Sequence, residues 1–293
     1  MDAGGSSTRA VAVDAHGAVV GRGSAGGANP NSNGLAAAAS NVAAAVAAAL
    51  DGRVCAGVVL GMAGSSKLLA EPAAMERYAT ALAGVGAPRP RVVSDAEVAF
   101  ASGAAEADGV VLIAGTGSIA MRITGHRRAA VAGGYGWLLG DEGSAFWLGR
   151  EAVRAALAAL LAGDATGPLV RAVLDDTGAS AFGELITVVN NRPPIALAQL
   201  APLVSAHAGD PVADDIAERA ATGLAGLARQ VWRGGPVVLA GSVAGPGTPV
   251  GTRLRRLLDG FDVRTADNGV LGAARLAAVA AFGERVGRAV TRA

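Results

Sequence analysis

Glycines and small hydroxyl side chains follow directly on an apolar run in the middle of the chain. Val110 to Ile113 lead into Gly115-Thr116-Gly117-Ser118. Glycines let a backbone approach a ligand closely, and successive backbone N–H groups together with hydroxyls can hold an oxyanion. The stretch therefore predicts a tight turn that binds phosphate oxygens. An ordinary turn within a sheet is the alternative, and the motif alone leaves both open.

The same glycines also fit G-x-G-x-x-A, the pattern of dinucleotide-binding proteins. That pattern requires a helix after the glycines. Here apolar residues alternate at Ile119, Met121 and Ile123 before the chain reaches Gly125, and such alternation predicts a second strand. A hairpin is therefore expected, and a nicotinamide or flavin enzyme is disfavoured.

Two aspartates stand where strands and loops meet helices. Asp95 follows the short strand predicted over 91–94, and a carboxylate at such a site can take a proton from a hydroxyl. It could instead cap the helix predicted over 96–105. Asp141 and Glu142 end a glycine-rich loop and could favour the next helix through its dipole. Asn29 beside Pro30 could simply form a turn.

Composition excludes several classes of function. The 293 residues suggest about two domains, and 25 basic against 24 acidic residues make nucleic acid and membrane poor candidates for a partner. The single cysteine, Cys55, allows neither an internal disulfide nor a cysteine cluster. No signal peptide is recognised before the first motif. A cytoplasmic protein is expected.

Strands and helices are expected to alternate, which indicates an α/β fold. Asp2 to Thr8 resembles the end of a strand and its glycine turn, so either the start is truncated in this numbering or the first strand is short. His16, His126 and His207 lie outside every motif and are expected at the surface or in turns, and Trp137 in the core. Strands are expected over 8–14, 18–24, 55–62, 91–94, 110–113, 236–240 and 261–265, with helices over 34–50, 71–83, 96–105, 144–162, 168–174, 182–190, 195–206, 211–231, 250–258 and 268–282.

The order of these pieces repeats. Ala3-Gly4-Gly5-Ser6 with its hairpin resembles Ala114-Gly115-Thr116-Gly117, and 58–61 before Ala63-Gly64-Ser65 resembles 237–240 before Gly241-Ser242. Two copies of one unit would place two glycine turns on either side of a polyphosphate, as phosphoryl transfer requires. We expect domains over 1–106, joined by the C-terminal helix 268–293, and over 107–267.

Taken together, the motifs resemble the actin-like ATPase superfamily, and within it the N-acetylglucosamine kinase branch of the BadF/BadG-type ATPase family. This resemblance implies two ribonuclease-H-like domains around a central cleft. It also implies ATP-dependent phosphorylation of the 6-hydroxyl of an amino sugar, N-acetyl-D-glucosamine first. Glucosamine or N-acetylmuramic acid as substrate, a dehydratase-activating ATPase and a sugar sensor without turnover are the alternatives. The matching stretches are 2–8, 29–31, 94–96, 115–118, 134–145, 241–245 and the final helix.

Roles follow from the resemblance residue by residue. Asp95 would be the catalytic base, and Asp2 would help to hold Mg²⁺ through water. A homodimer is the family expectation. The family often has a lysine after the first glycines, whereas Ser6 and Ser7 stand here. ATP would be bound by Gly4, Gly5, Ser6, Gly115, Thr116, Gly117, Ser118, Gly241, Ser242 and Gly245, and the sugar by Asn29, Asp95, Gly134, Tyr135, Gly136, Asp141 and Ala145.

Overall fold

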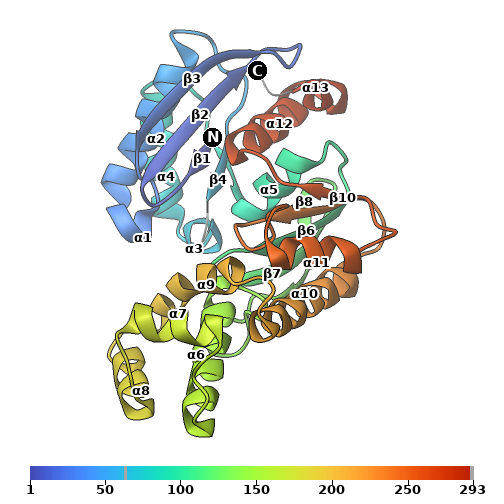
Figure 1. The fold of residues 1–293 in the computed structure, drawn as a ribbon. Coiled ribbons are helices and arrows are strands. Elements are labelled where there is room, and N and C mark those ends of the chain that lie inside the picture. The colour runs from blue at the N-terminus through green and yellow to red at the C-terminus, as the bar shows by residue number, and fades with distance from the viewer. Residues whose placement is uncertain (63–64, 291–293) are drawn as a thin grey trace. The chain divides into compact units, whose positions relative to one another are not determined.

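The computed structural model describes residues 1–62 and 65–290, so the predicted Ala63-Gly64 loop and the last three residues of the predicted final helix lie outside the described part (Figure 1). The chain forms two compact units. Unit 1 contains Met1–Asp108, Ile123–Arg127 and Ala266–Ala293, and unit 2 contains Gly109–Arg122 and Arg128–Thr265. The segment 123–127, expected in the second domain, thus packs with unit 1.

Unit 1 is built on a five-stranded sheet of order β3-β2-β1-β4-β5. The central strand β1 has two residues, runs antiparallel to β2 and runs parallel to β4. The strand expected from Cys55 begins only at Val59. The strands are β1 (Asp2–Ala3), β2 (Ser7–Val13), β3 (Val19–Gly26), β4 (Val59–Met62) and β5 (Arg91–Ser94).

Helices cover both faces of this sheet. The alanine-rich α2 packs on β2 and β3, and α12 packs on β2, β4 and α5. The short helix α1 occupies a stretch predicted as loop, because Asn29 O accepts the N–H groups of Ser32 and Asn33. Gly283, with φ of +86°, separates the predicted final helix into α12 and α13. The helices are α1 (Pro30–Asn33), α2 (Leu35–Leu50), α3 (Ser65–Leu69), α4 (Pro72–Ala83), α5 (Asp95–Gly103), α12 (Gly269–Phe282) and α13 (Glu284–Ala289).

Unit 2 repeats the same sheet. Its order is β10-β9-β6-β7-β8, which read backwards is the arrangement of unit 1, so the predicted duplication is confirmed. The chain forms strand β7 directly after the glycine turn, and the dinucleotide-binding alternative is therefore excluded. The strands are β6 (Gly109–Ala114), β7 (Ser118–Thr124), β8 (Arg127–Gly133), β9 (Val237–Ala240) and β10 (Val263–Thr265).

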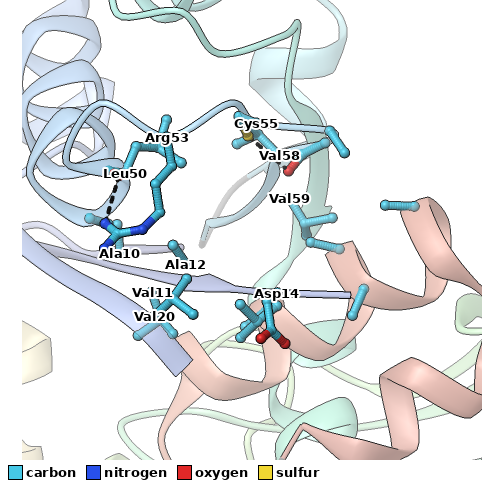
Figure 2. A pocket seen from close by; sticks show the side chains of 18 of the residues that line it. Ala10, Val11, Ala12, Asp14, Val20, Leu50, Arg53, Cys55, Val58 and Val59 are labelled. Atoms are coloured by element: carbon cyan, nitrogen blue, oxygen red, sulfur yellow. Dashed lines mark hydrogen bonds between the residues drawn. The ribbon is translucent and has the colours of Figure 1, made fainter. Parts of the chain in front are cut away.

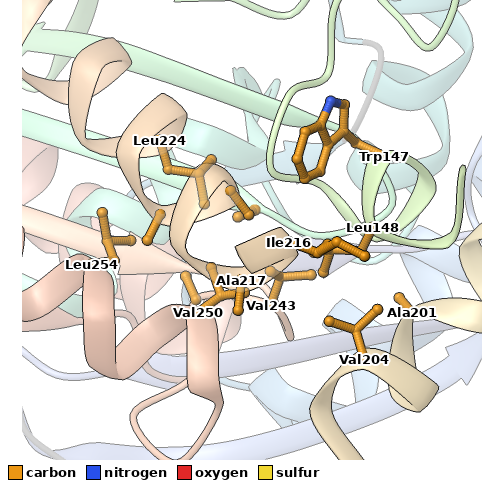
Figure 3. Packing of buried hydrophobic residues seen from close by; sticks show 14 of the residues in the cluster. Trp147, Leu148, Ala201, Val204, Ile216, Ala217, Leu224, Val243, Val250 and Leu254 are labelled. Atoms are coloured by element: carbon orange, nitrogen blue, oxygen red, sulfur yellow. The ribbon is translucent and has the colours of Figure 1, made fainter. Parts of the chain in front are cut away.

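The core of unit 2 lies between this sheet and its helices. Figure 3 shows Trp147 and Leu148 of α6 with Ile216 and Leu224 of α10 and Leu254 of α11. The predicted helix over 195–206 begins as a 3₁₀ turn, η1 (Pro194–Leu200), and continues as α9. The helices are α6 (Ala145–Ala162), α7 (Pro168–Thr177), α8 (Phe182–Asn190), α9 (Ala201–Ala206), α10 (Pro211–Val231) and α11 (Pro249–Leu257). Among the described residues, no helix is long and apolar enough to cross a membrane.

One expectation about a single residue is confirmed and one is wrong. His126 lies in a turn as predicted, although it is buried, and its Nε2 lies 2.8 Å from Glu284 Oε1. The partner is 158 positions away in the chain, so no local pattern reveals it. Trp137, expected in the core, is 42% exposed, because it belongs to a loop rather than to α6.

Candidate nucleotide and substrate site

The first glycine turn, Gly4 to Ser6, joins β1 to β2 in unit 1. Gly4 N–H donates to Ser7 O at 3.0 Å, which closes the turn. The carbonyl of Gly4 accepts from Ala28 and Asn29 N–H, and that of Gly5 accepts from Asn33 Nδ2. The carbonyls are therefore fixed against the 27–33 segment, and the exposed tip presents Gly5 and Ser6 to solvent. This is the arrangement an anion-binding backbone turn needs.

Asn29, predicted to bind the sugar, is part of the same structure. Its N–H lies 3.2 Å from Gly4 O, and its own carbonyl begins α1. The segment passes so close to the turn that position 27 requires glycine, since a Cβ on Gly27 would lie 1.9 Å from Gly5 O. Unit 1 thus places Asn29 directly beside the predicted phosphate turn.

Asp2 and Asp95 meet at one edge of the unit 1 sheet. Strands β1, β4 and β5 are parallel, with Ala3 opposite Met62 and Met62 opposite Ser94. The carboxyl ends of parallel strands open at the same edge, where α/β proteins bind their ligands. Asp2 is half-buried and Asp95 is exposed. The structure therefore brings the two predicted carboxylates of unit 1 into one neighbourhood.

Asp95 does not cap its helix, so the capping alternative is wrong. The N-cap of α5 is Ser94, whose Oγ accepts from Glu97 N–H at 3.2 Å while Glu97 Oε2 accepts from Ser94 N–H at 2.8 Å. This reciprocal capping box satisfies the first amides of the helix. Asp95 occupies the first helical position, where its Oδ1 accepts from the adjacent Ala96 N–H. Its carboxylate is available for another role.

The surroundings of Asp95 raise its pKa. Partial desolvation by neighbouring protein atoms is the largest cause, although one side of the group reaches solvent. Hydrogen bonds from the Ala96 and Asp95 N–H groups act in the opposite direction, and the charges of Asp2 and Glu97 raise the pKa further. A raised pKa moves a carboxylate toward the range in which it accepts a proton efficiently.

The second glycine turn is anchored on the start of α6 in unit 2. Gly115 N–H donates to Gly117 O at 3.0 Å, and the carbonyls of Gly115 and Thr116 accept from Ala145 and Phe146 N–H at 2.8 and 3.3 Å. The turn thereby satisfies amides that a helix N-terminus leaves without partners. Thr116 remains at the exposed tip.

Asp141 holds this turn in place. It is 9% exposed, its backbone is left-handed with φ of +61°, and its Oδ1 accepts from Ser118 N–H at 3.2 Å. Ser118 Oγ in turn donates to Glu142 O at 2.8 Å. A Cβ on Gly117 would lie 2.8 Å from Asp141 Oδ2, so the glycine is required for this approach. The helix cap is Ser144, not Asp141 or Glu142, since Ser144 Oγ accepts from Trp147 N–H.

The predicted adenosine loop lies beside this turn. Strands β6 and β9 are parallel, with Ile113 opposite Ala240, so both loops leave the same edge of the sheet. Val243 N–H donates to Ala114 O at 3.0 Å. Gly241 has φ of +92°, and a Cβ at this position would clash with Ala114 O at 2.3 Å. Gly241 and Ser242 are exposed. Unit 2 thus collects most of the predicted ATP-binding residues.

The residues that shape this loop were not predicted from the sequence. Thr248 Oγ1 donates to Val243 O and caps α11 by accepting from Gly251 N–H. Gly251 approaches so closely that a Cβ would lie 1.9 Å from Gly245 O, and Arg255 donates to Ala244 O. Thr248 followed by Pro249 is a helix-start signal, and it could have indicated the cap in advance.

The remaining predicted sugar-binding residues flank the second turn. Gly134 N–H donates to Ser118 O, and Ala145 N–H donates to Gly115 O. Tyr135 is 64% exposed, and Gly136, with φ of +80°, accepts from Leu139 and Gly140 N–H. Unit 2 therefore contains Gly134, Tyr135, Gly136, Asp141 and Ala145, and unit 1 contains Asn29 and Asp95.

The donor set in unit 1 fits a magnesium ion bound partly through water. Among the described residues, no group of three or more His, Cys, Asp or Glu side chains could enclose a metal. Mg²⁺ usually keeps several waters and takes one or two carboxylates together with substrate phosphates. Asp2 beside Asp95 supplies two hard oxygen donors whose negative charges a cation would offset.

The chain is similar over most of its length to solved structures of sugar kinases. A solved structure from Chromobacterium violaceum, provisionally assigned as an N-acetylglucosamine kinase, is 26% identical with a TM-score of 0.68, over 94% of this chain and 96% of that one. A similarly assigned structure from Porphyromonas gingivalis is 22% identical with a TM-score of 0.64, over 92% and 95% of the two chains. A glucokinase of the ROK family from Streptomyces griseus shares the fold at 23% identity, with a TM-score of 0.52 over 94% and 97%.

A shorter match has higher identity. The N-acetylmuramic acid/N-acetylglucosamine kinase of Clostridium acetobutylicum is 46% identical over 66 residues, which span 22% of each chain. The chain is thus aligned with about a fifth of that relative's length. The predicted fold class, two α/β domains of the actin-like ATPase type, is confirmed by the two sheets and these solved structures. Residues 1–248 match the BadF/BadG/BcrA/BcrD ATPase family, and the chain belongs to that family.

Proposed function

We propose that this protein is an ATP-dependent kinase that phosphorylates the 6-hydroxyl of an amino sugar, with N-acetyl-D-glucosamine as the leading candidate substrate. One observation carries the proposal: Asp95 follows directly on the carboxyl end of β5, beside the parallel strands β4 and β1, and Ser94 rather than Asp95 caps α5. Family membership and the resemblance to structures assigned as N-acetylglucosamine kinases support it.

The chemistry assigned to Asp95 is that of a general base. Its carboxylate would accept the proton of the sugar hydroxyl as that oxygen attacks the terminal phosphorus of ATP. Asn29 and the polar groups of the 134–145 loop would bind the other sugar hydroxyls. A site built to bind hydroxyls rejects analogues that lack them, because its own polar groups would lose their partners.

ATP is assigned to the glycine turns and the adenosine loop. The backbone N–H groups of Gly5, Ser6, Thr116 and Gly117 would hold phosphate oxygens, whereas those of Gly4, Gly115 and Ser118 donate within the protein and would act by shaping the two turns. Gly241, Ser242 and Gly245 would contact the nucleoside. The carbonyl groups of both turns accept hydrogen bonds from neighbouring segments, which holds each turn in place. The turns therefore need little rearrangement when phosphate binds. Mg²⁺, held by Asp2 through water, would supply charge neutralisation on the phosphates.

The test is Asp95→Asn, which keeps the size of the side chain and removes the base. Turnover should fall about a hundredfold or more. Binding of a non-hydrolysable ATP analogue, measured by calorimetry, should stay within twofold. The control is Asp176→Asn, an exposed position on α7. Unchanged turnover of Asp95→Asn in an ADP-release assay would refute the assignment.

The substrate is tested by a panel of sugars with Mg-ATP. N-acetylglucosamine, glucosamine, N-acetylmuramic acid and glucose differ in the acyl and lactyl groups that pocket shape selects. If kcat/KM is higher for glucosamine or N-acetylmuramic acid than for N-acetylglucosamine, that sugar is the preferred substrate and the proposal of a sugar kinase stands. ADP release without sugar phosphorylation would favour an ATPase activator, and binding without any turnover would favour a sensor.

We also propose that the protein is a cytoplasmic homodimer, as the resemblance implies. A lone cysteine fits a reducing compartment, because it needs no partner thiol. Sedimentation of the purified chain at several concentrations tests the dimer, and a monomer at all of them would contradict it.

A further inference from the structure

A row of three polar side chains crosses the unit 1 sheet beside the predicted phosphate turn. Asp2 of β1 lies opposite Arg9 of β2, and Arg9 lies opposite Ser24 of β3, in two antiparallel pairs. Directly opposite residues of an antiparallel pair project from the same face of the sheet, with their Cβ atoms about 5 Å apart. The carboxylate proposed to bind magnesium therefore has an arginine as its neighbour across the sheet.

This row projects from the face of the sheet that is turned toward α12. A Cβ on Gly269, at the start of α12, would lie 3.1 Å from Asp2 Oδ2, and Val11, two residues after Arg9, packs with apolar residues of α12 and α13. Figure 2 shows the alternation along β2, with Ala10 on one side of the strand and Val11 on the other. The helices cover this face at Val11, whereas Arg9 is exposed.

Arg9 is close enough to the phosphate turn to reach it. Ser7 stands two residues before Arg9 on the same face of β2, and its carbonyl closes the turn by accepting from Gly4 N–H. Two strand residues span about 7 Å, which an extended arginine side chain can cover. Among the described residues, the Arg9 side chain has no hydrogen bond or ion pair that would hold it away from the turn.

The duplicated turn of unit 2 has no charge at the corresponding place. Each turn is closed by a hydrogen bond to a carbonyl, that of Ser7 in unit 1 and that of Gly117 in unit 2. Two residues after this carbonyl stands Arg9 in unit 1 and Ile119 in unit 2. The same sheet thus accepts an apolar residue here, so the fold does not require the arginine. Its charge belongs to the unit that also contains Asp95, the proposed base.

We propose that Arg9 binds the terminal phosphate of ATP, an inference that rests on the proposed function. A guanidinium group stays charged and binds phosphate oxygens through two parallel hydrogen bonds. Asp2 interacts electrostatically with Asp95, so the row that contains Arg9 borders the place where the terminal phosphate is attacked. Both carboxylates repel that phosphate. Arg9 offsets the repulsion and stabilises the charge on the transferred group.

The test compares Arg9→Ala with the parent protein by calorimetry in the presence of Mg²⁺, with ADP and with a non-hydrolysable ATP analogue. The affinity for the ATP analogue should fall about tenfold or more, because charge-assisted hydrogen bonds to the terminal phosphate are lost. The affinity for ADP, which lacks this phosphate, should change by less than about threefold. Arg9 is exposed, so the thermal midpoint should stay within about 2 °C.

Two further variants separate a contact from a general effect of charge. Arg22→Ala is the matched control, because Arg22 is exposed on the same face of the sheet, opposite Val11 and farther from the turn. It removes the same charge and should leave the preference for the ATP analogue over ADP within about twofold. Ser7→Lys, added to Arg9→Ala, returns a cation to the same face of β2 and should restore most of the lost preference.

A preference in Arg9→Ala within twofold of the parent would overturn the proposal. So would an equal loss in Arg22→Ala, which would indicate the field of the whole sheet face rather than a contact. These measurements need no turnover. Failure of the proposed function would appear instead as a parent protein that binds ATP and phosphorylates no sugar, whereas failure of the Arg9 assignment alone would leave the parent active and Asp95→Asn inactive.

Discussion

At the scale of single residues, the surroundings that suit Asp95 to act as a base also lower the stability of the folded protein when Asp95 is ionised. Its pKa is raised in the folded protein, chiefly by desolvation. The unfolded chain therefore releases the proton first as pH rises, and the folded state loses stability through the window between the ordinary aspartate value and the raised one.

Asp95→Asn removes this cost and should be slightly more stable than the parent at pH 8. The gain should shrink as pH falls toward 4 and vanish below the ordinary aspartate pKa, where the carboxyl is protonated in both states. The measurement is the thermal midpoint of both proteins across that pH range. Because the side chain is exposed, the effect will be small. A midpoint for Asp95→Asn below that of the parent at pH 8 would contradict the raised pKa.

Sequence patterns at this scale identified residue types but not partners. They placed Asp95 and Asp141 at element boundaries, whereas the Asp141 contact with Ser118 and the His126 contact with Glu284 join positions 23 and 158 apart. Local spacing carries no information on such pairs. The spacing of Ser94 and Glu97 is that of a capping box and predicts the true cap of α5, whereas residue type alone also allows Asp95.

At the scale of elements, the capping box sets the direction in which α5 starts and hence the position of Asp95. Ser94→Ala should cost about 1 kcal/mol, seen as a thermal midpoint lower by about 2–4 °C. Turnover should fall less than in Asp95→Asn, because the base is retained but held less firmly. The comparison is Ser40→Ala, an exposed mid-helix position on α2 that should not lower the midpoint. Equal stability of the two variants would show that the box contributes nothing.

Most elements could be predicted, and the failures have a physical cause. The helix over 211–231 and the strands around the second turn follow from periodicity and from Pro and Gly signals. Helix α1 and the 3₁₀ start of the predicted helix over 195–206 were missed, because both begin beside prolines, which also favour loops and turns.

At the scale of the whole molecule, unit 1 is assembled from both ends of the chain. Helix α12 docks on α5 so closely that a Cβ on Gly272 would lie 2.1 Å from Val98 O, and Arg275 donates to Ala101 and Ala104 O at the end of α5. The duplicated sheet order could be read from the sequence, but this docking could not, since it joins segments about 170 residues apart.

Deletion of residues 266–293 should therefore unfold unit 1 and spare unit 2, whose core contains none of these residues. Hydrogen exchange should show lost protection in β4 and β5 and retained protection in β6 and β9. Protection retained in all four strands would mean that unit 1 is stable without its C-terminal helices. Loss in all four would mean that the two units fold together.

The exposed loop that contains Tyr135 also contains Trp137, whose fluorescence can report on the loop's surroundings. The chain has three tryptophans, of which Trp147 is 7% exposed and Trp137 is 42% exposed, two positions from a proposed sugar contact. A sugar that reaches Tyr135 should alter the polarity around this indole and shift its fluorescence emission, with Trp137→Phe as the silent reference. Affinities for unreactive sugars could thus be titrated in unlabelled protein, without nucleotide.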